Sequence, residues 1–265
     1  MKPFRVLDPN LPERMARGVC ALAVMTKAPQ AGRVKTRLVP PLTPEEAAEL
    51  NKCFLRDTAT AISSACSGGL RPPNAALHPG VHRAPLQCCG VAVYTPVGAE
   101  SAYNDILPAG FSLLPQRGDG FGKRLYFAIE DLFKCGFGAV CLIDSDSPTV
   151  PATNFAEAVE LLGTSEDVVV LGPSDDGGYY LIGVKKPHRH LFEQIDWSTE
   201  RVLNQTIQRA TEIGLEYKLL PTGYDVDDGA SLRRLCNELL GKNVGEDVVP
   251  NTRRFLVSIT AQEKL

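Results

Sequence analysis

The stretch "CLIDSDSP", Cys141 to Pro148, ends an apolar run with two aspartates spaced two residues apart and a closing proline. The run itself, 138–144, is apolar almost throughout, as the central strands of a parallel sheet usually are. Residues two apart in a strand point to the same side, so Asp144 and Asp146 would lie together. Two neighbouring carboxylates repel each other unless a cation lies between them. The stretch therefore predicts a buried strand whose end holds Mg²⁺ or Mn²⁺. A polar turn capped by Asp146 is the alternative.

Segments typical of strands alternate with segments typical of helices along the chain. Strands are expected at 18–26, 90–96, 111–116, 138–144, 167–173, 179–184 and 215–221. Helices are expected at 43–65, 122–136, 154–163, 198–214 and 229–241. This order predicts an α/β fold in which a mostly parallel, mixed sheet carries helices on both faces.

The length of 265 residues suits one domain, which we expect over residues 1–241. A segment rich in proline and glycine, 67–89, has no periodicity and is expected to be an exposed loop insertion. Residues 242–265 are expected to be a C-terminal extension, in which "RRFLVSIT" could form an edge strand.

The composition argues against several classes of protein. The net charge of −3 gives no basic surface for nucleic acid. No apolar run is long enough to span a membrane, and the N-terminal residues lack the apolar core of a signal peptide. The eight cysteines form no C-x-x-C pair, and Cys88 and Cys89 are expected in a loop. Reduced thiols of this kind indicate a cytoplasmic protein.

A basic loop follows the first expected strand. It contains Lys27, Arg33, Lys35 and Arg37, with Gly32 at a bend. Four cations in one loop at the end of a strand suit a polyphosphate ligand, although the spacing is not that of a Walker A loop. A solvated basic loop without a ligand is the alternative.

Two further acidic pairs follow expected strands, where ligands of open α/β sheets bind. Asp175 and Asp176 precede two glycines, a pattern typical of a hairpin turn that could also carry a binding carboxylate. Asp225 and Asp227 precede a helix. They could complete the metal site, or Asp227 or Asp228 could cap that helix.

Six separated elements, in this order, resemble a bacterial glycosyltransferase-like family of the GT-A superfamily, the nucleotide-diphospho-sugar transferases. This family is related in fold to the molybdenum-cofactor and phospholactate guanylyltransferases. The elements are Lys27–Leu38, Gln116–Arg124, Ser145–Pro148, Gly172–Gly183, Trp197–Thr199 and Asp225–Asp227. The resemblance covers about residues 19–235 and leaves out the segment 67–89 and the C-terminal residues.

The resemblance implies a single-domain GT-A-like, Rossmann-like fold and a divalent-metal-dependent transferase that takes a nucleotide-diphosphate sugar and an unidentified small-molecule acceptor. It implies phosphate binding by Lys27, Gly32, Arg33, Lys35, Arg37 and Arg124. It implies metal binding by Asp144, Asp146, Asp225 and Asp227, and acceptor binding by Asp175, Asp176, Tyr179 and Trp197. Asp146 and Asp176 would be the catalytic residues.

Two other functions remain open at this point. A nucleotidyltransferase of the same fold would take a nucleoside triphosphate and release pyrophosphate, but the glycine-rich opening of those enzymes is here "MTKAPQAGRVKTR". A non-catalytic nucleotide-binding module would keep the fold without turnover. A dinucleotide-binding fingerprint is not formed at 117–125, because its third glycine position is Lys123.

Overall fold

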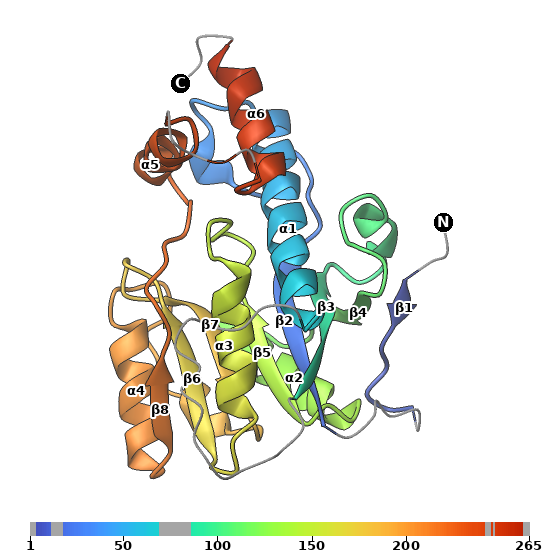
Figure 1. Cartoon of the computed structure of the whole chain (residues 1–265), viewed down its shortest axis with the longest axis vertical. Coiled ribbons are helices and arrows are strands. Elements are labelled where there is room, and N and C mark those ends of the chain that lie inside the picture. Colours follow the sequence, from blue (N-terminus) through green and yellow to red (C-terminus); the bar gives the residue numbers. More distant parts are fainter. Residues whose placement is uncertain (1–3, 12–17, 69–85, 242–244, 246, 262–265) are drawn as a thin grey trace.

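The computed structural model describes residues 4–11, 18–68, 86–241, 245 and 247–261. Its centre is an eight-stranded sheet in the order β1-β4-β3-β2-β5-β7-β6-β8 (Figure 1). The strands are β1 (Arg5–Val6), β2 (Val19–Lys27), β3 (Gln87–Thr95), β4 (Ser112–Pro115), β5 (Ala139–Ile143), β6 (Val168–Pro173), β7 (Tyr179–Val184) and β8 (Glu216–Leu219). The pairings are parallel except those of β7, which is antiparallel to β5 and β6. The prediction of a mostly parallel, mixed α/β sheet is confirmed.

Helices cover both faces of this sheet. They are α1 (Pro44–Cys66), α2 (Phe121–Lys134), α3 (Ala152–Leu162), α4 (Val202–Glu212), α5 (Gly229–Leu239) and α6 (Pro250–Thr260), with short 3-10 helices η1 (Thr36–Leu38), η2 (Glu100–Tyr103) and η3 (Arg189–Phe192). Side chains of α1 and α3 pack on one face, and those of α2 and α4 on the other. Along β2, Leu22 faces the first core and Ala23 the second. Because both faces are buried, the central strands are apolar throughout.

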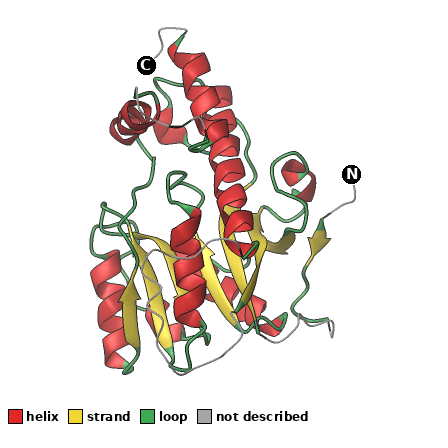
Figure 2. Cartoon of the chain, in the orientation of Figure 1, coloured by secondary structure: helices red, strands yellow, loops and turns green. Residues whose placement is uncertain are grey.

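The helices α5 and α6 lie beyond one end of the strands, beside one end of α1 (Figure 1 and Figure 2). A third apolar cluster joins them to α1 and η1. In α6, Thr252, Leu256 and Ile259 are buried, and this spacing is helical. Of the alternatives for "RRFLVSIT", the edge strand is therefore wrong, since packing against α1 and α5 selects a helix.

A buried carboxylate fixes the start of α6. Asp57, on α1, accepts hydrogen bonds from the backbone N–H of Asn251 at 3.1 Å and of Thr252 at 2.8 Å. It also accepts one from Asn251 Nδ2 at 2.7 Å. The first N–H groups of a helix have no partner within the helix, and a carboxylate is favoured there. The C-terminal helix is thus tied to the first helix of the sheet.

Two local expectations differ from the structure, and a third lies mostly outside the described residues. Cys88 and Cys89 lie in β3, paired with Cys20 and Ala21 of β2, and not in a loop. Of the expected insertion, 69–85 lies outside the described residues. The helix expected from residue 198 begins at Val202, after a turn in which Ser198 has a left-handed backbone (φ 64°). Among the described helices, none is long and apolar enough to cross a bilayer.

Candidate active site

The acidic stretch after β5 turns at the carboxyl edge of the sheet. Asp144 Oδ1 accepts hydrogen bonds from the backbone N–H groups of Asp146 and Ser147, both at 3.2 Å. Asp144 Oδ2 accepts one from Ser147 Oγ at 2.8 Å. Burial, together with the charges of Asp146 and Asp225, raises the pKa of Asp144 to about 8. The end of β5 therefore concentrates carboxyl groups at the carboxyl edge of the sheet, and one of them, that of Asp144, holds its proton more tightly than an ordinary aspartate.

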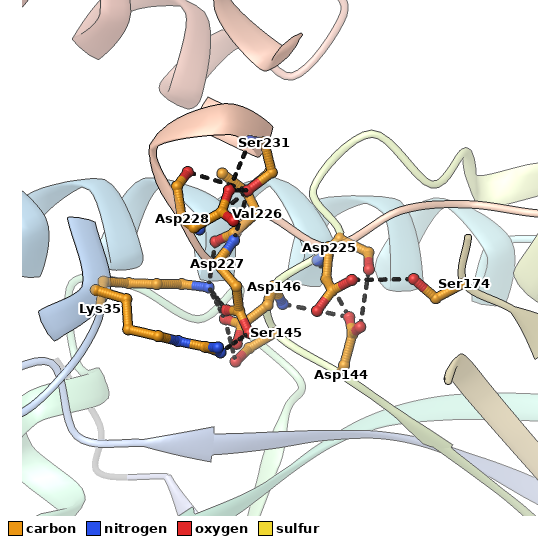
Figure 3. Close-up of polar contacts among 12 residues, drawn as sticks. Lys35, Asp144, Ser145, Asp146, Ser174, Asp225, Val226, Asp227, Asp228 and Ser231 are labelled. Atoms are coloured by element: carbon orange, nitrogen blue, oxygen red, sulfur yellow. Dashed lines mark hydrogen bonds and ion pairs between the residues drawn. The ribbon is translucent and has the colours of Figure 1, made fainter. Parts of the chain in front are cut away.

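A second acidic segment lies against the first (Figure 3). Asp225 accepts a hydrogen bond from Ser174 Oγ at 3.0 Å, beside Asp144. The backbone N–H of Val226 donates to the carbonyl of Asp146 at 2.9 Å, which brings Asp227 alongside Asp146. Burial raises the pKa of Asp225, and the nearby carboxylates of Asp176 and Asp227 add to this.

The ammonium of Lys35 lies between Asp146 and Asp227. Its Nζ is 2.9 Å from Asp146 Oδ1 and 3.0 Å from Asp227 Oδ1, and it donates to the carbonyl of Val226 at 2.7 Å. The lysine side chain is 4% exposed. Burial lowers the pKa of Lys35, but the two carboxylates outweigh this effect and raise it above its ordinary value. Arg37 pairs with the other oxygen of Asp227.

The capping alternative for the segment 225–228 is resolved by its geometry. Asp228 caps α5, accepting from the backbone N–H groups of Ala230 at 2.9 Å and Ser231 at 2.8 Å. Asp227, one residue earlier, is left for Lys35 and Arg37. Asp228 thus caps the helix, and Asp227 forms the ion pairs.

One cleft of about 280 Å³ joins the basic loop to these carboxylates. Its lining consists of Lys27, Arg33, Val34, Lys35, Thr36, Arg37, Asn51, Ser145, Asp146 and Asp227. Lys27 and Arg33 are exposed, and Gly32 beside them has a left-handed backbone (φ 71°) with open space around it. The lining of the cleft therefore combines cations and carboxylates.

Asn51 is a lining residue that the sequence does not single out. It lies in α1, is 5% exposed, and its Oδ1 finds no hydrogen-bond partner among the described residues. The signal was an amide at a buried position of an amphipathic helix, between Leu50 and Phe54 on the apolar face. Buried amides are normally hydrogen-bonded, so a polar residue here is unusual.

The residues expected to bind an acceptor lie outside the lining of this cleft. Asp175 pairs with Arg234 of α5. Asp176 is exposed and accepts from the backbone N–H of Gly178 at 2.8 Å. Tyr179 packs in the core under α4, where its hydroxyl is buried beside that of Thr206; neither hydroxyl has a hydrogen-bond partner among the described residues. Of this group, Asp176 is the carboxylate whose charge reaches Asp225.

Arg124 lies in the first turn of α2, and Trp197 packs against that turn. Arg124 donates from Nε to the carbonyl of Gly118 at 3.4 Å, and it does not line the cleft. The ring of Trp197 meets that of Phe121 edge to face, with centroids 5.2 Å apart, and covers Gly122 so closely that a Cβ there would lie 2.5 Å from the indole nitrogen. Phosphate binding by Arg124 and acceptor binding by Trp197 stay predictions.

The donor set suits a hard divalent cation. Asp146 and Asp227 each place one oxygen about 3 Å from a shared cation, the Lys35 ammonium. Within the ranges that the structure describes, no cluster of three His, Cys, Asp or Glu side chains is poised to hold a metal. Mg²⁺ is usually bound through one or two carboxylates, with water and substrate phosphates supplying the other ligands. Two carboxylates beside a basic loop fit that mode.

Comparison with known proteins places this arrangement in a fold family. A protein from Desulfovibrio desulfuricans G20, assigned as a nucleotide-diphospho-sugar transferase, aligns with a TM-score of 0.76 and 25% identity over 93% of this chain and 96% of that chain. The chain has the fold of the nucleotide-diphospho-sugar transferases. The predictions of this fold and of a transferase are confirmed. A 4-diphosphocytidyl-2C-methyl-D-erythritol synthase from Anaerococcus prevotii DSM 20548 shares the fold at 11% identity and a TM-score of 0.50, over 84% of this chain and 96% of that chain.

The sequence comparisons are narrower than the structural ones. Residues 83–199 match the model of a family described as an uncharacterized protein conserved in bacteria (DUF2064). None of the curated proteins matches the chain. The matched region contains Asp144 and Asp146 but neither the basic loop nor Asp225 and Asp227. Of the residues that line the cleft, the family model thus covers Ser145 and Asp146 and omits the others.

Proposed function

We propose that the chain is a divalent-metal-dependent transferase that uses a nucleotide-diphosphate sugar as donor. The observation that carries this proposal is the cleft itself, whose lining combines Lys27, Arg33 and Arg37 with Asp146 and Asp227. A diphosphate with its cation needs both kinds of side chain, because its charge is neutralised by basic side chains and by a metal held on carboxylates. Sugar transfer is favoured over other phosphate chemistry by the similarity to the nucleotide-diphospho-sugar transferase.

In this proposal the residues of the cleft bind and orient the donor. Lys27 and Arg33, which are exposed, contact the diphosphate oxygens. Asp146 and Asp227 hold Mg²⁺ or Mn²⁺, with the carboxyl groups of Asp144 and Asp225 beside them. When bound, the metal neutralises charge that develops on the leaving diphosphate. The basic side chains share that electrostatic stabilisation, so that little covalent chemistry is asked of the protein.

Asp176 is the residue we assign to the acceptor. Its carboxylate is exposed, accepts one backbone N–H, and is close enough to Asp225 to raise that residue's pKa. An ionised carboxylate in this position can orient an acceptor hydroxyl and take up its proton. Asp175, by contrast, is engaged by Arg234. The acceptor is a small molecule, and the free thiols of the described cysteines suit the cytoplasm.

The test is a binding and turnover panel on the full chain. Nucleotide-diphosphate sugars and nucleoside triphosphates of the common bases would be titrated by calorimetry with and without Mn²⁺, and the products separated by chromatography. We expect metal-dependent binding and release of a nucleoside diphosphate. Release of pyrophosphate from a triphosphate would replace the proposal with nucleotidyl transfer. Binding without turnover across acceptors would indicate a non-catalytic module, and no binding at all would refute the assignment of the cleft.

A further inference from the structure

Lys35 has no free hydrogen-bond donor in this structure. An ammonium has three N–H groups. Those of Lys35 are directed to Asp146 Oδ1, Asp227 Oδ1 and the carbonyl of Val226, at 2.9, 3.0 and 2.7 Å. The ammonium is also 5.5 Å from the centre of the Phe54 ring, and the side chain is almost completely buried. In this conformation Lys35 therefore cannot donate to a phosphate, although it lines the cleft.

The same ammonium takes the oxygens that a metal would need. Mg²⁺ binds its oxygen ligands at about 2.0–2.1 Å. A divalent cation coordinated by the oxygens that now contact Lys35 would stand almost on the position of Nζ. Two positive charges at that separation repel strongly in a partly buried site. Occupation of these oxygens by the lysine and by a metal is therefore mutually exclusive.

The backbone around Lys35 is able to release it. Lys35 itself is left-handed (φ 48°, ψ 37°), which is costly for a residue with a side chain and persists where surrounding contacts impose it. Gly32, three residues earlier, is also left-handed and has nothing near it that a Cβ would touch. Loss of the three side-chain contacts would remove what holds the strained residue in place.

We infer that Lys35 is an internal cation that competes with the divalent metal for Asp146 and Asp227, and that nucleotide phosphates relieve the competition by accepting the ammonium. The inference rests on the proposed function for its second half. A phosphate in the cleft offers Lys35 new acceptors, and its departure from Asp146 and Asp227 frees their oxygens. Metal and nucleotide are then expected to bind together, with weak metal binding to the free protein. Lys35 is in this sense a positioning residue for the metal ligands.

The competition is tested by metal affinity without nucleotide. Mn²⁺ would be titrated into wild type, Lys35→Met and Lys35→Gln, with free Mn²⁺ measured by electron paramagnetic resonance. Both variants should bind Mn²⁺ more tightly than wild type by roughly 5- to 150-fold, the usual range of coupling between two sites. Lys27→Met is the matched control, because it removes one positive charge from the same cleft at an exposed position. A gain at Lys35 no larger than that at Lys27 would overturn the inference.

A second readout covers variants that do not fold. Removing Lys35 leaves two carboxylates facing each other, so circular dichroism would be recorded with and without Mn²⁺. Folding that is restored by Mn²⁺ supports the inference, and unfolding that is indifferent to Mn²⁺ overturns it. These measurements use no nucleotide. If no nucleotide bound, the proposed function would be refuted, but the competition between Lys35 and the metal could still be tested by Mn²⁺ affinity.

The release by phosphate is tested by a difference between two proteins. The gain in Mn²⁺ affinity on saturation with UDP or GDP would be measured for wild type and Lys35→Met. The gain should be larger in wild type, because only there does the nucleotide also free the carboxylates. Equal gains would show that the phosphates do not act through Lys35.

Discussion

The carboxylate of Asp57 allows a quantitative prediction about the C-terminal helix. In Asp57→Ala, the backbone N–H groups of Asn251 and Thr252 lose their acceptor. Thr252 is 0% exposed, so water cannot replace the lost bond without opening the contact between α1 and α6. A buried unsatisfied donor costs about 1–3 kcal/mol, and loss of a helix cap costs about 0.5–2 kcal/mol. Because these costs overlap, we expect a loss of about 2–4 kcal/mol in the free energy of unfolding.

The measurement is urea unfolding followed by circular dichroism, with hydrogen exchange of residues 250–260 as a local probe. Asp57→Asn keeps one acceptor oxygen and loses the charge, so about half the effect is expected. Asp119→Ala is the control, since that aspartate is exposed and such changes usually stay within about 0.5 kcal/mol. If Asp57→Ala matches this control and the exchange of α6 is unchanged, the carboxylate does not hold the helix.

Three further predictions concern the candidate active site. Asp146→Asn should weaken metal-dependent nucleotide binding by roughly 10- to 100-fold; titration with and without Mn²⁺ checks this, and equal affinities in both conditions would contradict it. Arg33→Ala should weaken the binding of a nucleoside diphosphate by about 1.5–3 kcal/mol and leave the binding of the bare nucleoside unchanged. Calorimetry with both ligands decides, and equal losses of affinity would mean that the loop does not bind phosphate. Asp176→Asn should slow turnover by roughly 10²–10⁴-fold with donor affinity preserved; steady-state kinetics would reject the assignment if affinity fell and saturated turnover did not.

The sheet could be predicted because its signal is local. Buried strands such as β5 and β2 are continuous apolar runs, and their alternation with amphipathic helices gave the fold class. The helix α6 could not be predicted in the same way. Its residues include Phe255, Val257 and Ile259, which also suit a strand, and the contact that selects the helix is with Asp57, far away in the sequence. Tertiary contacts decided where propensity did not.

The site could be predicted as a set of residue types but not as a set of contacts. The spacing of Asp144, Asp146, Asp225 and Asp227 indicated a cation, and the structure brings the two segments that carry them together at one edge of the sheet. That Lys35 would occupy this place could not be seen, because nothing in the basic loop distinguishes it from its neighbours. Tyr179 shows the same limit: the hairpin pattern is satisfied whether its hydroxyl faces the cleft or, as here, the core.

The contacts of Lys35 join positions of the chain that are synthesised far apart in time. Its partners Val226 and Asp227 lie 191 and 192 residues further along. At a synthesis rate of about 5–20 residues per second, the basic loop leaves the ribosome about 10–40 s before Asp227 does. The carboxylates after β5 are also synthesised well before Asp225 and Asp227, which complete their site. A growing chain therefore carries the separate pieces of the cleft for most of its synthesis, and the cation site closes only when the segment before α5 arrives.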